Sequence, residues 1–210
     1  MDITLYVKFF LGLVAIINPV GLLPVFVSLT SHQNNVDRKH TAKVANFAVV
    51  VILLVTIVAG QHILNMFSIS LSAFRIAGGS LIAIIAMSML QGKLGEVKRN
   101  QEEDRESSAM ESVAVVPLAL PLMAGPGAIS SVIVFAAEHN TLMNVLGMFV
   151  TVIIFGLLSY LLFSLASIIY RILGKTGINV ITRLMGLLML SIGIEVIAAG
   201  FKGMFPSLLG

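Results

Sequence analysis

The chain has 210 residues, of which 58% are hydrophobic and 11% are charged, and its formal net charge is +3. A soluble domain is roughly 45–50% apolar and about 25% charged, and a chain this short has too little interior to hide so much apolar surface from water. The composition therefore excludes an ordinary soluble domain and predicts an all-α, polytopic membrane protein, with residues 1–210 forming a single membrane domain.

Charged and turn residues divide the apolar sequence into six segments, each about as long as a helix that crosses a bilayer, which needs about 20 residues. The first apolar run is too long for the hydrophobic region of a signal peptide, so we expect it to be retained as a span. In chain order, the expected spans cover residues 5–29, 44–65, 70–91, 113–137, 143–170 and 179–201.

The connections between these spans carry an uneven distribution of positive charge. Those near 30–43, 92–112 and 171–178, together with the span edge beside them, hold ten of the lysines and arginines, and the other side holds three. The positive-inside rule predicts that the charged loops are cytoplasmic and that both termini are periplasmic. The basic balance therefore indicates orientation in a bilayer rather than a nucleic-acid partner.

Two of the expected spans contain helix-breaking clusters. The first holds Asn18-Pro19-Val20-Gly21-Leu22-Leu23-Pro24, and the fourth holds Gly125-Pro126-Gly127 after two further prolines. Proline lacks a backbone N–H and clashes with the preceding turn. Broken backbone survives in a membrane only where protein covers it or it lines a wet cavity. We therefore expect helices 1 and 4 to be broken at these motifs.

The spacing of these motifs predicts an internal repeat. Pro19 and Pro126 are 107 positions apart, and the R-x-x-G sequences that begin at Arg75 and Arg183 are 108 apart. The first repeat covers about 1–91 and the second about 113–210, joined by the hydrophilic loop at 92–112. Each repeat contains three spans, so the second copy is expected to be inverted in the membrane.

Secondary transporters bind substrate between such repeats, where half-helix ends and unwound backbone are exposed. A half-helix N-terminus favours a carboxylate and free carbonyls favour an ammonium, which together suit a small amino acid. Because proline and glycine are common in membrane helices, the breaks can also be purely architectural. The residues predicted to lie near the substrate are Asn18, Pro19, Gly21, Pro24, Gly125, Pro126, Gly127, Ser130 and Ser131.

Three charged residues in or near the spans are candidates for coupling or gating: Glu195, Arg75 and Arg183. An ionisable group inside a span is costly and is a functional candidate by default. Glu195 could carry a coupling proton or reach the outer interface, and the two arginines could gate a pathway or anchor the helix ends. Glycines recur every seven residues at Gly186, Gly193 and Gly200, which predicts close helix packing within the chain or against a second copy in a homo-oligomer.

The sequence does not favour an enzyme. It lacks cysteine and the G-x-S-x-G motif, and neither Ser130 nor Ser131 has a histidine within an expected span to act as a base. Gly174-Lys175-Thr176 resembles the end of a phosphate loop, but position 169 is isoleucine where that motif requires glycine. We therefore expect no catalytic site, no bound metal and no cofactor.

Several segments together resemble the bacterial MarC family, also called the small neutral amino acid transporter family, and the resemblance covers essentially the whole chain. The GKLGE sequence at 92–96 further resembles the family's inner-membrane members of the YchE type. The resemblance implies six spans in a bacterial inner membrane and, for one branch, uptake of glycine and alanine. The segments are INPVGLLPVF (17–26), FRIAGGSLIAIIAMSML (74–90), VPLALPLMAGPGAIS (116–130) and TGINVITRLMGLLMLSIGIE (176–195).

The resulting hypothesis is a secondary transporter of small neutral amino acids that works by alternating access and is coupled to protons or sodium. An exporter of small metabolites or drugs on the same scaffold is the first alternative, because import and export use the same cycle. A membrane scaffold or channel without coupled transport is the second, although the spans carry no rings of charge of the kind that line channels.

Overall fold

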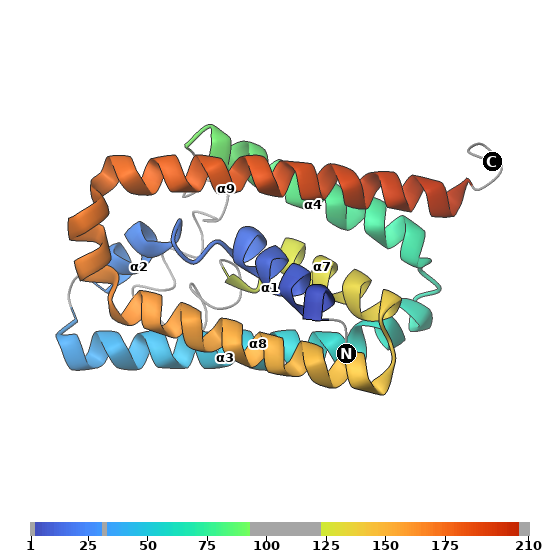
Figure 1. Ribbon diagram of the computed structural model, residues 1–210, viewed down its shortest axis with the longest axis horizontal. Coiled ribbons are helices and arrows are strands. Elements are labelled where there is room, and N and C mark those ends of the chain that lie inside the picture. Colours follow the sequence, from blue (N-terminus) through green and yellow to red (C-terminus); the bar gives the residue numbers. More distant parts are fainter. Residues whose placement is uncertain (1–2, 31–32, 93–122, 206–210) are drawn as a thin grey trace.

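The computed structural model describes residues 3–30, 33–92 and 123–205, and these residues form helices without any strand (Figure 1). Four of the helices are long and apolar enough to cross a membrane, whereas α1 and α7 are shorter apolar helices. The helices are α1 (Ile3–Ile17), α2 (Leu23–Leu29), α3 (Asn35–Met66), α4 (Leu71–Leu90), α7 (Pro126–Glu138), α8 (Leu142–Ser164) and α9 (Ala166–Met204).

The helices are arranged in three layers (Figure 1). Helices α4 and α9 pack against each other on one side, and α3 and α8 pack against each other on the opposite side. The short helices α1, α2 and α7 lie between these two pairs, with α1 contacting α8 and α9 and α7 contacting α3 and α4. The apolar outer faces of the long helices suit lipid rather than water, as the exposed Phe47, Val51 and Val55 of α3 illustrate.

The first span is broken where the sequence predicts. Helix α1 ends at Ile17, and Asn18 takes a positive φ of 47°. Pro19 has no N–H to donate to the carbonyl of Ala15, so the helical ladder cannot continue through this residue. The chain resumes as α2 at Leu23. The expectation of a break in helix 1 is therefore confirmed.

The fourth span is described only from Met123 onward. Helix α7 begins at Pro126, with Gly125 as its N-cap residue. Proline suits the first turn of a helix, where its missing N–H is not needed. The earlier part of the span expected at 113–137, and nearly all of the hydrophilic loop expected at 92–112, lie outside the described residues.

The expected start of the second span is wrong. Helix α3 begins at Asn35, nine residues before the predicted start at 44, so most of the polar connection expected at 30–43 is helical. The Asn34 side chain accepts hydrogen bonds from the amides of Val36 and Asp37, and Asp37 complements the positive end of the helix dipole. Good capping, rather than hydrophobicity, therefore sets the start of this helix.

The expected fifth span at 143–170 is too long, and the loop expected at 171–178 is almost entirely helical. Helix α8 ends at Ser164, and α9 begins at Ala166 and is bent at Gly174, whose φ of 62° and ψ of 179° suit glycine alone. We call residues 166–173 the arm. Figure 1 shows the arm crossing the end of the bundle from the α3–α8 pair to the α4–α9 pair.

The glycines predicted to form a packing surface on the last span face α4. A Cβ at Gly193 would lie 2.9 Å from the carbonyl oxygen of Gly79, and one at Gly200 would lie 2.8 Å from that of Ser72. A Cβ at Gly186 would similarly lie 3.1 Å from the carbonyl oxygen of Ala86. Only glycine allows the two backbones to approach this closely. The partner of the glycine stripe is therefore within the chain.

Candidate functional site

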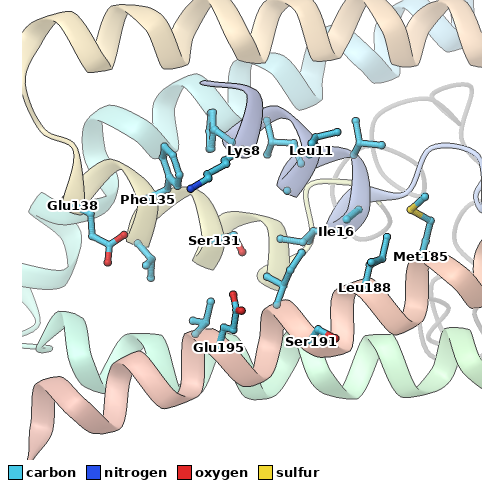
Figure 2. Close-up of a pocket in the computed structure, with 18 residues that line it drawn as sticks. Lys8, Leu11, Ile16, Ser131, Phe135, Glu138, Met185, Leu188, Ser191 and Glu195 are labelled. Carbon is cyan, nitrogen blue, oxygen red and sulfur yellow. The ribbon is translucent and has the colours of Figure 1, made fainter. Parts of the chain in front are cut away.

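A cavity of about 720 Å³ lies between α1, α7 and α9 (Figure 2). Its walls are mostly apolar and include Leu13 and Ile16 of α1, Phe135 of α7 and Leu188 of α9. Apolar walls with a few polar groups are typical of small-molecule sites. The residues that line the cavity place it beside the C-terminal half of α1.

The polar groups of this cavity are few. Figure 2 shows Glu195 extending from α9 into the cavity, with Ser131 of α7 and Ser191 of α9 also on its walls. Ser191 donates its hydroxyl hydrogen to the carbonyl of Leu187 in its own helix, at 3.2 Å. Glu195 therefore places an acidic side chain in a largely apolar space.

Two further charged residues, Lys8 of α1 and Glu138 of α7, lie toward one end of the cavity. Glu138 forms an ion pair with Arg75 at the start of α4, and Arg75 is the more buried partner. This pair fixes the end of α7 to α4. The same end of the cavity thus carries both signs of charge.

Two helix ends of opposite polarity meet beside the cavity. A Cβ at Gly127, in the first turn of α7, would lie 4.0 Å from Cγ2 of Ile16, in the last turn of α1. The carbonyls of Ala15, Ile16 and Ile17 accept no backbone hydrogen bond from the described residues, because the helix ends there. The amides of Gly127 and Ala128, in the first turn of α7, likewise donate to no backbone carbonyl of the described residues. A partially negative terminus therefore lies close to a partially positive one.

The break in the first span is held by its own side chain. The Oδ1 atom of Asn18 accepts a hydrogen bond from the Gly21 amide at 3.2 Å. Asn18 is 2% exposed, and its Nδ2 atom has no hydrogen-bond partner in the described part of the chain. A Cβ at Gly21 would collide with the Asn18 side chain and lie 3.0 Å from Oγ1 of Thr182 on α9. Glycine is therefore required at position 21 to keep this arrangement.

The predicted substrate residues are divided between the cavity and the two breaks. Ser131 lines the cavity, whereas Asn18, Pro19 and Gly21 are buried in the first break. Ser130 is also buried, and its side chain is what a Cβ at Gly78 of α4 would meet. The remaining members of the set lie at the ends of α2 and α7 and are absent from the described lining of the cavity: Pro24, Gly125, Pro126 and Gly127.

The coupling and gating candidates lie apart from one another. Glu195 lines the cavity, and Arg75 contacts it only indirectly, through Glu138. The Arg183 guanidinium lies at the other end of the molecule, beside Gly92 after α4. The three residues therefore do not form one cluster.

Sequence reasoning did not identify Lys8, Glu138, Ser191 or Thr182 as parts of this region. Lys8 and Glu138 occur near the ends of expected spans, where charge is ordinary, and nothing in their local sequence shows that their helices are neighbours. Ser191 could have been found from helical spacing, because it lies four residues before Glu195 and therefore on the same helix face. Thr182 gives no such signal, because it is adjacent to Arg183 and adjacent residues of a helix point in different directions.

Comparisons with known proteins find relatives that are integral membrane proteins. The model of the MarC family of integral membrane proteins matches residues 3–205. The chain is 51% identical to the Escherichia coli K12 UPF0056 membrane protein YhcE over 99% of this chain and 97% of that protein. It is 34% identical to a UPF0056 membrane protein of Aquifex aeolicus over 95% and 94%, and 36% identical to YvbG of Bacillus subtilis over 99% of both. No solved structure matches the chain.

Proposed function

The chain belongs to the MarC family of integral membrane proteins, and on that basis we propose that it is a secondary transporter of small neutral amino acids such as glycine and alanine. The observation that carries the proposal is the meeting of the C-terminus of α1 with the N-terminus of α7 beside an apolar cavity. An amino acid carries an ammonium and a carboxylate on the same carbon. Two opposed half-helix ends complement that pair of charges.

The side chains around the breaks support the same substrate class. The buried Nδ2 atom of Asn18 needs an acceptor, because an unpaired buried donor costs about 1–3 kcal/mol. A substrate carboxylate would supply that acceptor. On the cavity side, Glu195 would attract an ammonium, and the aliphatic wall formed by Leu13, Ile16 and Leu188 would accept a short apolar side chain.

The architecture supports transport by alternating access between two inverted repeats. Under the 107–108-residue offset, α3 corresponds to α8, α4 corresponds to α9, and α2 corresponds to α7. The corresponding long helices pair with one another, and α2 contacts α9 as α7 contacts α4. In this proposal, one repeat moves against the other around the broken helices, driven by a proton or sodium gradient.

The proposed setting is the bacterial inner membrane, with both termini periplasmic. The start of α1 and the end of α9 lie at the same end of the bundle as the connections at 67–70 and 139–141 (Figure 1). The absence of native cysteine allows a direct test. A single cysteine near residue 69 or 140 is expected to react with an impermeant reagent from the periplasm, whereas one near residue 34 is not.

Uptake of radiolabelled glycine and alanine into proteoliposomes tests the proposed function. We expect accumulation that depends on an imposed proton or sodium gradient and that unlabelled amino acid competes away. Asn18→Ala and Gly125→Leu should abolish it, because they remove the buried donor and crowd the start of α7.

Size-exclusion profiles of the same variants serve as the control, since a misfolded variant would indicate that the breaks are architectural. The absence of uptake by folded, inserted wild-type protein under either gradient would contradict import. Export, or a role without transport, would then explain the fold better.

A further inference from the structure

We propose that the chain binds a sodium ion between α3, α8 and the end of α1, at a site formed by Asn46, Ser159 and free main-chain carbonyls. The binding site stands on the structure alone, whereas its role as the coupling site for transport rests on the proposed function. The site lies on the α3–α8 side of the first break. The described lining of the cavity includes neither Asn46 nor Ser159.

The first observation is a pair of buried oxygen atoms without partners. Asn46 is 3% exposed, and its Nδ2 atom donates to the carbonyl of Ala42 at 2.7 Å, which leaves Oδ1 unpaired in the described part of the chain. Ser159 is fully buried, and within the described residues its Oγ atom also has no partner. Buried polar atoms normally have hydrogen-bond partners, so these two need an explanation.

Ser159 differs from comparable hydroxyl residues of the bundle. The hydroxyls of Thr56, Ser88 and Thr151 each donate to the carbonyl four residues earlier in their own helix, at 2.7 to 3.1 Å. This bond is the usual way for a buried hydroxyl in a membrane helix to satisfy its hydrogen. Ser159 does not make it, so its hydroxyl oxygen remains available to a ligand.

The packing of α3 on α8 places the two residues at similar depth. A Cβ at Gly156 would collide with the Val50 side chain, so these residues face each other. Asn46 precedes Val50 by four residues and Ser159 follows Gly156 by three. Because the two helices run in opposite directions (Figure 1), both residues lie on the same side of this contact, about 6 Å and about 4.5 Å along their helices.

The same helix faces contact the layer of short helices. Phe155 packs against Phe10 of α1, and Phe163 packs against Phe26 of α2. Ser159 lies midway between these two phenylalanines on one stripe of α8. Helix α1 ends and α2 begins between Phe10 and Phe26, so Ser159 lies at the level of the break.

Asn46 has a corresponding orientation on α3. It lies fourteen residues before Gly60, which is nearly a whole number of helical turns, and Gly60 faces Ile133 of α7. Both polar residues therefore face the middle layer, Asn46 from the side of α3 that contacts α7 and Ser159 from the side of α8 that contacts α1. Helix α1 ends in this layer, and the carbonyls of Ala15, Ile16 and Ile17 are unpaired in the described chain.

The chemistry of these groups selects the ligand. Amide, hydroxyl and carbonyl oxygens are ligands for hard cations, and unwound carbonyls at half-helix ends are typical sodium ligands in transporters. None of these groups titrates near neutral pH, so they cannot carry a coupling proton. Neutral ligands also leave the charge of a divalent ion uncompensated in a buried site, which is strongly unfavourable. A monovalent cation, and sodium in particular, fits these requirements.

The test is thermal stability of the purified full chain in detergent, measured in NaCl, KCl and choline chloride at equal ionic strength. The fraction that remains monodisperse on size exclusion after heating is a suitable readout, because the chain has no tryptophan and no cysteine for fluorescence methods. Sodium is expected to stabilise the wild type by an amount that rises with the logarithm of its concentration above the dissociation constant. Equal stabilisation by KCl and NaCl, or by neither salt, would overturn the assignment.

Ser159→Ala and Asn46→Leu are the decisive variants. Each removes one proposed ligand, and we expect the dissociation constant for sodium to rise about tenfold or more, which corresponds to about 1.4 kcal/mol. Ser159→Ala is expected to fold normally, because it removes only a hydroxyl that has no partner among the described residues. A sodium response in Ser159→Ala equal to that of wild type would overturn the site.

Ser164→Ala is the matched control. The Ser164 hydroxyl also lacks a partner in the described chain. Ser164 follows Ser159 by five residues, so its side chain points about 140° away from that of Ser159 around the axis of α8. Its sodium response should equal that of wild type. In the uptake assay, amino-acid accumulation that is indifferent to sodium would overturn the site's coupling role and leave the proposed function standing. Sodium binding that needs Ser159, in a protein without uptake, would leave the site standing and remove the proposed function.

Discussion

The two outer helix pairs are built in different ways. Helices α4 and α9 are joined through glycine, with the backbones of Gly79 and Gly193 in close approach, and the Ser80 and Ser88 hydroxyls of α4 bond within their own helix. Helices α3 and α8 are joined through side chains, as at Val50 and Gly156, and Asn46 and Ser159 have polar atoms without a partner among the described residues. The difference is that the first pair is fixed by backbone contact, whereas the second leaves polar groups for the sodium ion that we propose.

The largest expected effect on stability comes from adding a methyl group where α4 meets α9. In Gly79→Ala, the new Cβ would lie 2.7 Å from the Gly193 carbonyl oxygen, which is backbone and cannot turn aside. We expect a loss of about 1–3 kcal/mol in the free energy of unfolding, as for other overpacked cores. Denaturation of the purified variant in mixed micelles measures it.

Gly156→Ala is the matched change in the other pair, where the obstacle is the Val50 side chain. A side chain can adopt another rotamer, so this variant should lose clearly less stability than Gly79→Ala. Equal losses would show that both pairs are joined with the same rigidity, and the comparison between them would fail.

A smaller effect is expected on the cavity face of α9. Glu195 lies on this helix but lines the cavity, away from the glycine stripe that contacts α4. Glu195→Gln should leave stability unchanged and raise the half-saturating amino-acid concentration about three- to tenfold, because one charge that attracts the ammonium is lost. Saturation curves for uptake measure this, with Ser191→Ala as a control that keeps the carboxylate. An unchanged half-saturation value would remove Glu195 from the proposed site.

The smallest effect is expected at the joint between the middle layer and α4. The ion pair between Arg75 and Glu138 is partly exposed, with 42% of the Glu138 side chain accessible. Such pairs contribute about 0–1 kcal/mol, so Glu138→Gln should reduce stability by no more than that amount, and high salt should remove most of the difference. A larger, salt-independent loss would show that this joint stabilises the bundle as strongly as the glycine contacts do.

The sequence predicts the elements whose causes are local. Pro19 breaks the helix of the first span whatever packs around it, because its own missing N–H is the cause. The seven-residue recurrence of glycine predicts a close packing face on the last span. The early start of α3 was missed, because charge in its first turns conceals a helix that the Asn34 cap begins. The arm was missed because the sequence signal at Gly174 is one glycine among many.

The candidate site is less accessible to sequence reasoning. Ser131 and Glu195 were selected from local signals and line the cavity, whereas Lys8 and Glu138 come from helices whose proximity depends on tertiary packing. Asn46 and Ser159 resemble any polar residue in an apolar span. What distinguishes them is the absence of a partner among the described residues, and only the fold shows that.

The arm has a consequence for how the molecule sits in lipid. It lies across the end of the bundle and exposes Ile168 and Ile172. Because the neighbouring helices are long enough to cross a membrane, we expect this end to lie at the level of the lipid headgroups. Short apolar helices that lie in the plane of the membrane interface are held at a fixed depth in the headgroup region. Arg38 donates hydrogen bonds both to Ser167 of the arm and to the carbonyl of Thr30, just after α2. A movement of the arm with bilayer thickness would therefore be passed through Arg38 to the end of α2, which follows the break in the first span.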